Sequence, residues 1–209
     1  VGVTGGVPGG VPGGVTGGGN GQASLAQMLD GVADTFARRF GGEPGTEADQ
    51  AGLAVLRDRL AGHRTPRCIV HGDFWVGNLL ADKGRVLGVI DWEQASLNGS
   101  PVRDLAKFAT SYSLYLDRHA RPGHRVPGHR GLVAGRWGAG VEYAIDGAGW
   151  YPDLVRSFVV SGLERLGASP SCWRDVLLAD VAASAANADH DDFARNHLLL
   201  FRRLTGRRP

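Results

Sequence analysis

Lysine is scarce in this sequence. Lys83 and Lys107 are the only two, and arginine supplies the rest of the 23 basic residues. This scarcity restricts any mechanism that needs a lysine at a defined place. Cysteine is equally scarce, because Cys68 and Cys172 are the only two and lie far apart, without CxxC or His-paired spacing. Neither a zinc site nor a disulfide framework is therefore predicted, and a reducing, cytoplasmic environment fits best.

Long apolar runs are also missing. No uninterrupted apolar stretch reaches the ~18 to 20 residues needed to cross a bilayer. Glycine interrupts the N-terminus, which lacks the basic region and apolar core of a signal peptide. The formal net charge is only +2, and the arginines form no aromatic-interleaved stripe. We therefore expect a cytoplasmic protein that binds neither nucleic acid nor membranes, and the sequence leaves its oligomeric state open.

Low complexity marks the N-terminal segment. Residues 3–18 read VTGGVPGGVPGGVTGG, a four-residue repeat run four times. Glycine has no side chain to bury and proline blocks regular pairing, so residues 1–22 are predicted to be a disordered tail. No GxxxxGK[ST] occurs, which argues against a phosphate loop. The 43% hydrophobic content of the chain is enough for one domain, which we place at residues 23–209.

Helical periodicity dominates that domain. Apolar residues recur at spacings of three and four over residues 23–40 and 47–60, which predicts two amphipathic helices. Short apolar runs predict a strand and then a β-hairpin, at residues 68–70 and at 79–81 and 86–90 around a turn at 82–84. Further helices are predicted near residues 101–118, 137–147, 152–166, 171–187 and 190–204, with a Pro- and Gly-rich loop at 121–129. The fold class is therefore α+β, mostly helical, with only short strands.

Residues 71–78, HGDFWVGN, carry the residue types needed for phosphoryl transfer. This reaction needs an acidic residue that orients the attacking hydroxyl and accepts its proton, together with oxygen ligands for Mg²⁺. Asp73 follows the short strand, and four intervening residues let the chain turn back and aim the Asn78 amide oxygen at a metal. The hairpin then returns a second carboxylate, Asp91, to the same neighbourhood. Ordinary turn chemistry is the alternative for Asp73 and Asn78, because both residue types favour turns.

The pattern H-G-D-x-x-x-x-N, followed about a dozen residues later by I-D-W-E, resembles the motifs of the aminoglycoside phosphotransferase and choline kinase-like family, which shares the protein-kinase fold. The resemblance implies that Asp73 is the catalytic base. It also implies that Asn78 and Asp91 bind Mg²⁺ and, through it, ATP, and that His71 organises the loop. Residues 101–106, PVRDLA, resemble a downstream P-x-x-D-L-A element of the family, which makes Asp104 a support for the catalytic loop.

The resemblance covers roughly residues 50–205, the C-terminal lobe of such an enzyme. A family kinase also has an N-terminal lobe with a lysine that positions the ATP phosphates, and here no lysine precedes Lys83. Two hypotheses follow. The chain is either an incomplete form of an ATP-dependent phosphotransferase that acts on a hydroxyl of a small molecule, or a catalytically inactive lobe that serves as a binding or scaffold module. The first residue, valine, suggests a truncated or mis-started sequence, and the substrate stays open.

Other polar and aromatic residues have simpler interpretations. Core packing is favoured over substrate stacking for Trp75 and Trp92. Glu93 either reaches the site or is solvated or paired with an arginine. The acidic cluster at residues 189–192 is favoured as a helix start over a receiver of a cationic substrate. Surface or capping roles are predicted for the remaining histidines, namely His63, His119, His124, His129, His190 and His197.

Overall fold

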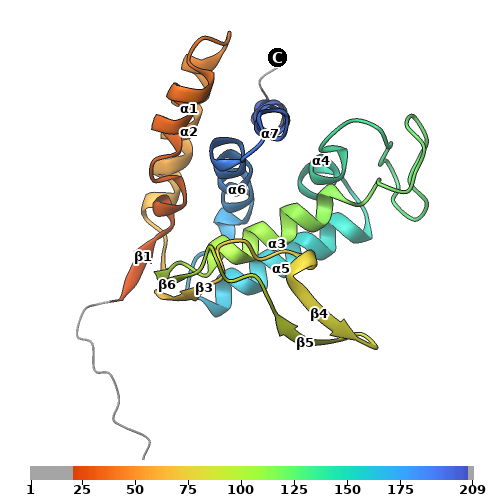
Figure 1. The fold of residues 1–209 in the computed structure, drawn as a ribbon, viewed down its shortest axis with the longest axis horizontal. Coiled ribbons are helices and arrows are strands. Elements are labelled where there is room, and N and C mark those ends of the chain that lie inside the picture. Colours follow the sequence, from red (N-terminus) through yellow and green to blue (C-terminus); the bar gives the residue numbers. More distant parts are fainter. Residues whose placement is uncertain (1–20, 207–209) are drawn as a thin grey trace, which may run out of the picture.

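The computed structural model describes residues 21–206, and its helices account for most of that range (Figure 1). The first half contains β1 (Gln22–Ser24), the 3₁₀ helix η1 (Leu25–Leu29), α1 (Val32–Phe40), α2 (Thr46–Ala61), β2 (Arg64–Pro66), β3 (Cys68–Val70), η2 (Val76–Asn78), β4 (Leu79–Asp82), β5 (Arg85–Val89) and β6 (Ser96–Gly99). The second half contains α3 (Val102–Leu114), α4 (Ala139–Asp146), α5 (Trp150–Arg165), η3 (Pro170–Cys172), α6 (Trp173–Asn187) and α7 (Asp191–Leu204).

The described strands form three two-stranded antiparallel sheets, β1 with β2, β3 with β6 and β4 with β5. The predicted α+β, mostly helical class with short strands is confirmed at this level. The predicted hairpin is β4 and β5, and its turn places Lys83 at φ 46° and Gly84 at φ 77°. Such left-handed angles suit a tight hairpin turn, whose twist matches that of the strands.

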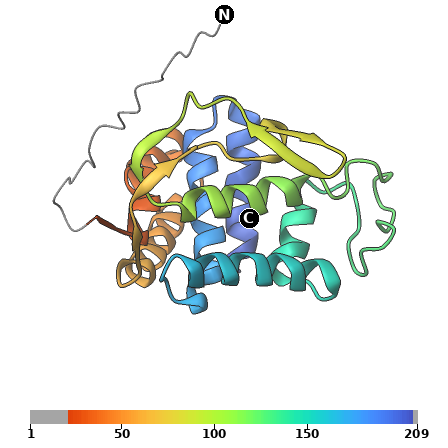
Figure 2. The same ribbon diagram turned by 90° about the horizontal axis from the view of Figure 1, so that it is seen from below.

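Helix α6 is the centre of the core. Four of its alanines, Ala179, Ala182, Ala185 and Ala186, are almost fully buried. Their small side chains let other helices approach closely, and α6 packs against α1, α2, α3, α5 and α7. The pair α1 and α2 lies along one side of α6, and α4 lies toward the opposite end of the molecule (Figures 1 and 2). Helix α3 contacts both α5 and α6, so it is held between the helical core and the strands that lie across it (Figure 2).

Two predicted elements differ from the structure. The helix predicted over residues 23–40 is three elements, because the Ser24 hydroxyl caps η1 and Gly31, at φ 70°, turns the chain before α1. The helix predicted to reach residue 118 ends at Leu114, after which backbone N–H groups bond three residues back and tighten the chain. The other predicted helices agree to within two residues at each end. Most of the tail predicted over residues 1–22 lies outside the described residues, namely residues 1–20. Gly21 and Gln22 are described, and Gln22 belongs to β1.

Candidate active site

The segment after β3 is joined to the β4–β5 hairpin through His71. This side chain is only 2% exposed. Its Nδ1 accepts a hydrogen bond from the Asp73 backbone N–H at 3.3 Å, and its Nε2 lies 2.8 Å from the carbonyl oxygen of Ile90. Because Nδ1 accepts a hydrogen bond, Nε2 is the ring nitrogen that donates to the Ile90 carbonyl. His71 thus connects the start of the loop to the end of β5.

Asp104, in the first turn of α3, supports the same loop. Its two carboxylate oxygens accept hydrogen bonds from the backbone N–H groups of His71, at 2.6 Å, and Gly72, at 2.8 Å. Gly72 has φ 85°, and a Cβ there would lie 2.2 Å from the carbonyl oxygen of Gln94. A glycine is required at this position, because a side chain would collide with the backbone of the neighbouring segment. These contacts fix the backbone immediately before Asp73.

Asn78 closes the loop from the other end. The side-chain nitrogen of Asn78 donates to the backbone carbonyl oxygen of Asp73 at 2.9 Å. The backbone carbonyl oxygen of Asn78 accepts from the Ile90 N–H at 3.0 Å. Because the amide nitrogen is already used, Oδ1 is the atom of Asn78 that suits a cation. Asp91 follows Ile90 directly and is exposed, with φ 64°. This left-handed angle is uncommon for a residue with a side chain, and Asp tolerates it better than most.

The donor set fits magnesium. An amide oxygen and a carboxylate are oxygen ligands, and Mg²⁺ is usually held by one or two carboxylates, with water and substrate phosphates completing the set. Among residues 21–206 no cluster of three or more His, Cys, Asp or Glu side chains is placed to hold a metal ion. Asn78 and Asp91 offer two oxygen ligands of this kind, and the phosphates of a substrate would have to supply others.

Lys107, which sequence reasoning did not single out, lies against the candidate base. Its Nζ is 3.5 Å from Oδ1 of Asp73. Lys107 is one turn after Asp104 on α3, so the two side chains share a face of that helix. The spacing of three residues between Asp104 and Lys107 could have predicted this contact from the sequence. A helix that supports the loop with Asp104 also presents Lys107 to the loop.

A buried carboxylate lies behind this pair. Asp180 on α6 accepts a short hydrogen bond from the Thr110 hydroxyl. Its burial raises its pKa, and the positive charges of Lys107 and Arg103 and the Thr110 hydrogen bond oppose that shift. Lys107 therefore interacts with two carboxylates, Asp73 in the loop and Asp180 in the core.

Two cavities meet at Asp73 and Lys107. One, of about 450 Å³, runs from Gly72 and Gln94 to the start of α7 at Asp189 and His190. The other, of about 220 Å³, is lined by mostly aromatic and polar side chains, namely Trp75, Thr110, Ser111, Leu114, Tyr115, Ser184, Phe193 and His197. Asp73 thus lines two adjoining cavities.

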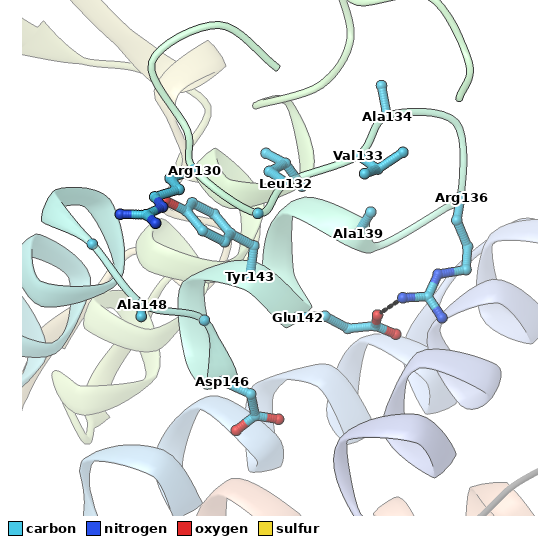
Figure 3. A pocket seen from close by; sticks show the side chains of 13 residues that line it. Arg130, Leu132, Val133, Ala134, Arg136, Ala139, Glu142, Tyr143, Asp146 and Ala148 are labelled. Carbon is cyan, nitrogen blue, oxygen red and sulfur yellow. Dashed lines mark hydrogen bonds and ion pairs between the residues drawn. The ribbon is translucent and has the colours of Figure 1, made fainter. Parts of the chain in front are cut away.

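A larger cavity lies elsewhere. It measures about 830 Å³ and lies between the 130–136 segment and α4, and it shares no lining residue with the cavities around Asp73 (Figure 3). Its acidic residues are already paired: Glu142 with Arg136 and Arg203, and Asp146 with Arg174. Size alone therefore does not locate the chemistry, and the smaller cavities contain the candidate catalytic groups.

Several side chains lie where the simpler interpretations did not put them. His197 is buried beside Phe193 and Trp137, and this burial lowers its pKa to about 4. A surface or capping role is therefore wrong for it. Trp92 is 48% exposed and covers the His71 ring, with centroids 4.7 Å apart, so it is not a core residue.

The remaining aromatic and acidic residues match their expected surroundings more closely. Trp75 is half-buried and stacks on Tyr115 at 6.0 Å. Asp191 and Asp192 lie in the first turn of α7, as expected of a helix start, and Asp191 pairs with Arg39 at 2.7 Å.

The loop, its support from α3 and the adjoining cavities define a candidate phosphoryl-transfer site. The match to known families agrees: the model of the phosphotransferase enzyme family matches residues 27–134, from η1 to the loop after α3. The chain belongs to this phosphotransferase family. No curated protein and no solved structure matches it.

Proposed function

We propose that this protein is a phosphotransferase that moves the terminal phosphoryl group of ATP to a hydroxyl of a small molecule, in the cytoplasm. The observation that carries the proposal is the position of Asp73. Its backbone is fixed by His71 and Asn78, and its carboxylate opens to both cavities. We also infer that residues 23–209 correspond to the C-terminal lobe of a protein-kinase-like fold.

In the proposed reaction, Asp73 accepts the proton of the attacking hydroxyl. The acceptor oxygen forms a bond to phosphorus while the bond from phosphorus to the bridging oxygen of ATP breaks, and ADP leaves with the electron pair. Mg²⁺ held by Asn78 and Asp91 would neutralise charge on the phosphates. Asp104 and His71 touch no reacting atom in this scheme and act as positioning residues, because their contacts are to the loop backbone and to Ile90.

A second candidate function is a catalytically inactive binding or scaffold module. The observation that favours it is the placement of lysine within residues 21–206: Lys83 lies in the hairpin turn and Lys107 lies on α3, so neither belongs to a strand that precedes the loop. A search of the DNA upstream for an in-frame, strand-rich stretch with a lysine and a later glutamate discriminates between the two functions.

The direct test is phosphoryl transfer by the complete product of the gene. Mg²⁺, ATP and a panel of small hydroxyl compounds would be supplied, and ADP release and phosphorylated product measured for the wild type and for Asp73→Asn. We expect the variant to lose about 10²- to 10⁴-fold in kcat, the range that general base catalysis contributes. Equal rates in the two proteins, or no product from any acceptor, would contradict the proposal and favour the inactive module.

A further inference from the structure

The ion pair of Lys107 and Asp73 contributes little to the stability of the fold. The side chains are 26% and 39% exposed, and their closest atoms are 3.5 Å apart. Pairs of this kind contribute little to stability, typically about 0–1 kcal/mol. The contact with Asp73 therefore adds little stability by itself.

The surroundings of Lys107 keep its charge at the junction of the two cavities. Lys107 lines both cavities, as Asp73 does. Behind it lies Asp180, a carboxylate buried in α6 that requires nearby positive charge or hydrogen bonds to be tolerated. Thr110 supplies the hydrogen bond, and Lys107 and Arg103 supply the charge. The ammonium group is therefore held where two substrates would meet.

We propose that Lys107 is a catalytic residue of this site, whose ammonium group contacts the phosphoryl group as it passes to the acceptor oxygen. The inference rests on the phosphotransferase function proposed above. Phosphoryl transfer is accelerated mainly by positioning and by positive charge around the moving group. Lys107 is placed to supply such charge from helix α3, next to the base and outside the loop motif.

The proton and charge changes are balanced in this scheme. The acceptor hydroxyl gives its proton to Asp73, which becomes neutral, and the acceptor oxygen replaces the bridging oxygen of ATP at phosphorus. Lys107 stays protonated throughout and donates hydrogen bonds only. Because the pair is partly exposed and its closest atoms are 3.5 Å apart, the ammonium group can shift from Asp73 toward phosphoryl oxygens that enter the site. The ion pair in the structure is thus the resting partner of a group that acts elsewhere.

The scarcity of lysine allows a test on the unaltered 209-residue chain. An amine-acylating reagent is applied with and without inorganic pyrophosphate, and modification of each lysine is followed by mass spectrometry. We expect pyrophosphate to slow modification of Lys107 several-fold and to leave Lys83 unchanged, because Lys83 lines neither cavity around Asp73. Equal rates at Lys107 with and without pyrophosphate would overturn a phosphate contact, and this result needs no variant to fold.

Variants of the complete gene product supply the second arm. Lys107→Met is expected to lower kcat by about 10²-fold, as for removal of one transition-state donor, with a smaller change in KM. Lys107→Arg should recover part of the rate, and Lys83→Met is the matched control for loss of a lysine. A purely structural lysine would lower the unfolding temperature and leave kcat of the folded fraction unchanged.

The outcomes separate this inference from the proposed function. Turnover that depends on Asp73 but not on Lys107 overturns the role of Lys107 and leaves the phosphotransferase function intact. Protection of Lys107 by pyrophosphate without turnover of any acceptor supports the phosphate contact and overturns the catalytic function. Loss of rate in both Asp73→Asn and Lys107→Met, with protection of Lys107, supports both.

Discussion

The helices around α6 and the strand segment from β3 to β6 hold their conformations in different ways. The helical region encloses large side chains completely, with Phe36, Leu163 and Phe201 among those that have no exposed surface. The strand segment leaves large apolar side chains in solvent, and Leu97 and Leu87 are 81% and 70% exposed. The difference shows that the loop is positioned by a few polar contacts to α3 and β5, while burial stabilises the helical part beneath it.

The largest stability effect is expected from the helical region. Phe201→Ala removes a fully buried ring that packs edge-on against Phe36 at 6.3 Å, and should lower the free energy of unfolding by about 3–5 kcal/mol. Urea unfolding followed by circular dichroism measures this loss. His197→Phe, at a neighbouring buried position, keeps an aromatic ring in the core and serves as the control for the loss of a ring. A change below 1 kcal/mol would show that this core does not hold the fold.

A smaller stability effect but a larger functional one is expected where the strands meet α3. Asp104→Ala leaves the N–H groups of His71 and Gly72 without their acceptor, which should cost about 1–3 kcal/mol in stability. Because the loop then loses its position, turnover should fall more than stability alone explains. Asp104→Asn keeps one acceptor oxygen and should be intermediate in both urea unfolding and kcat. Full activity in Asp104→Ala would mean that the loop is held by other contacts.

The smallest effect is expected on the exposed strand surface. Leu97→Ser replaces a side chain that is almost entirely in solvent, so the free energy of unfolding should change by no more than about 0.5 kcal/mol. Urea unfolding and light scattering would be compared with the wild type. A loss above 1 kcal/mol would show that Leu97 is covered in solution, and the contrast between the two regions would then need revision.

The sequence predicted the loop better than its surroundings. Asp73, Asn78 and Asp104 could be named because each lies in a short motif, and Asp104 and Asn78 do contact the loop backbone. Lys107 could not be named from a motif, because its contact joins α3 to a loop more than thirty residues earlier in the chain. His197 was readable in principle: it shares a helical spacing of three and four with Ala194 and Phe201, the buried face of α7.

Ile90 shows what a residue can contribute without its side chain. Its N–H and carbonyl groups bond to Asn78 and His71, while its side chain is 44% exposed. Many residue types could therefore replace isoleucine here and keep both bonds, whereas proline could not, because it has no N–H to donate. A position that accepts nearly every substitution in a mutational scan can thus be one on which the geometry of the site depends, and its tolerance would conceal that dependence.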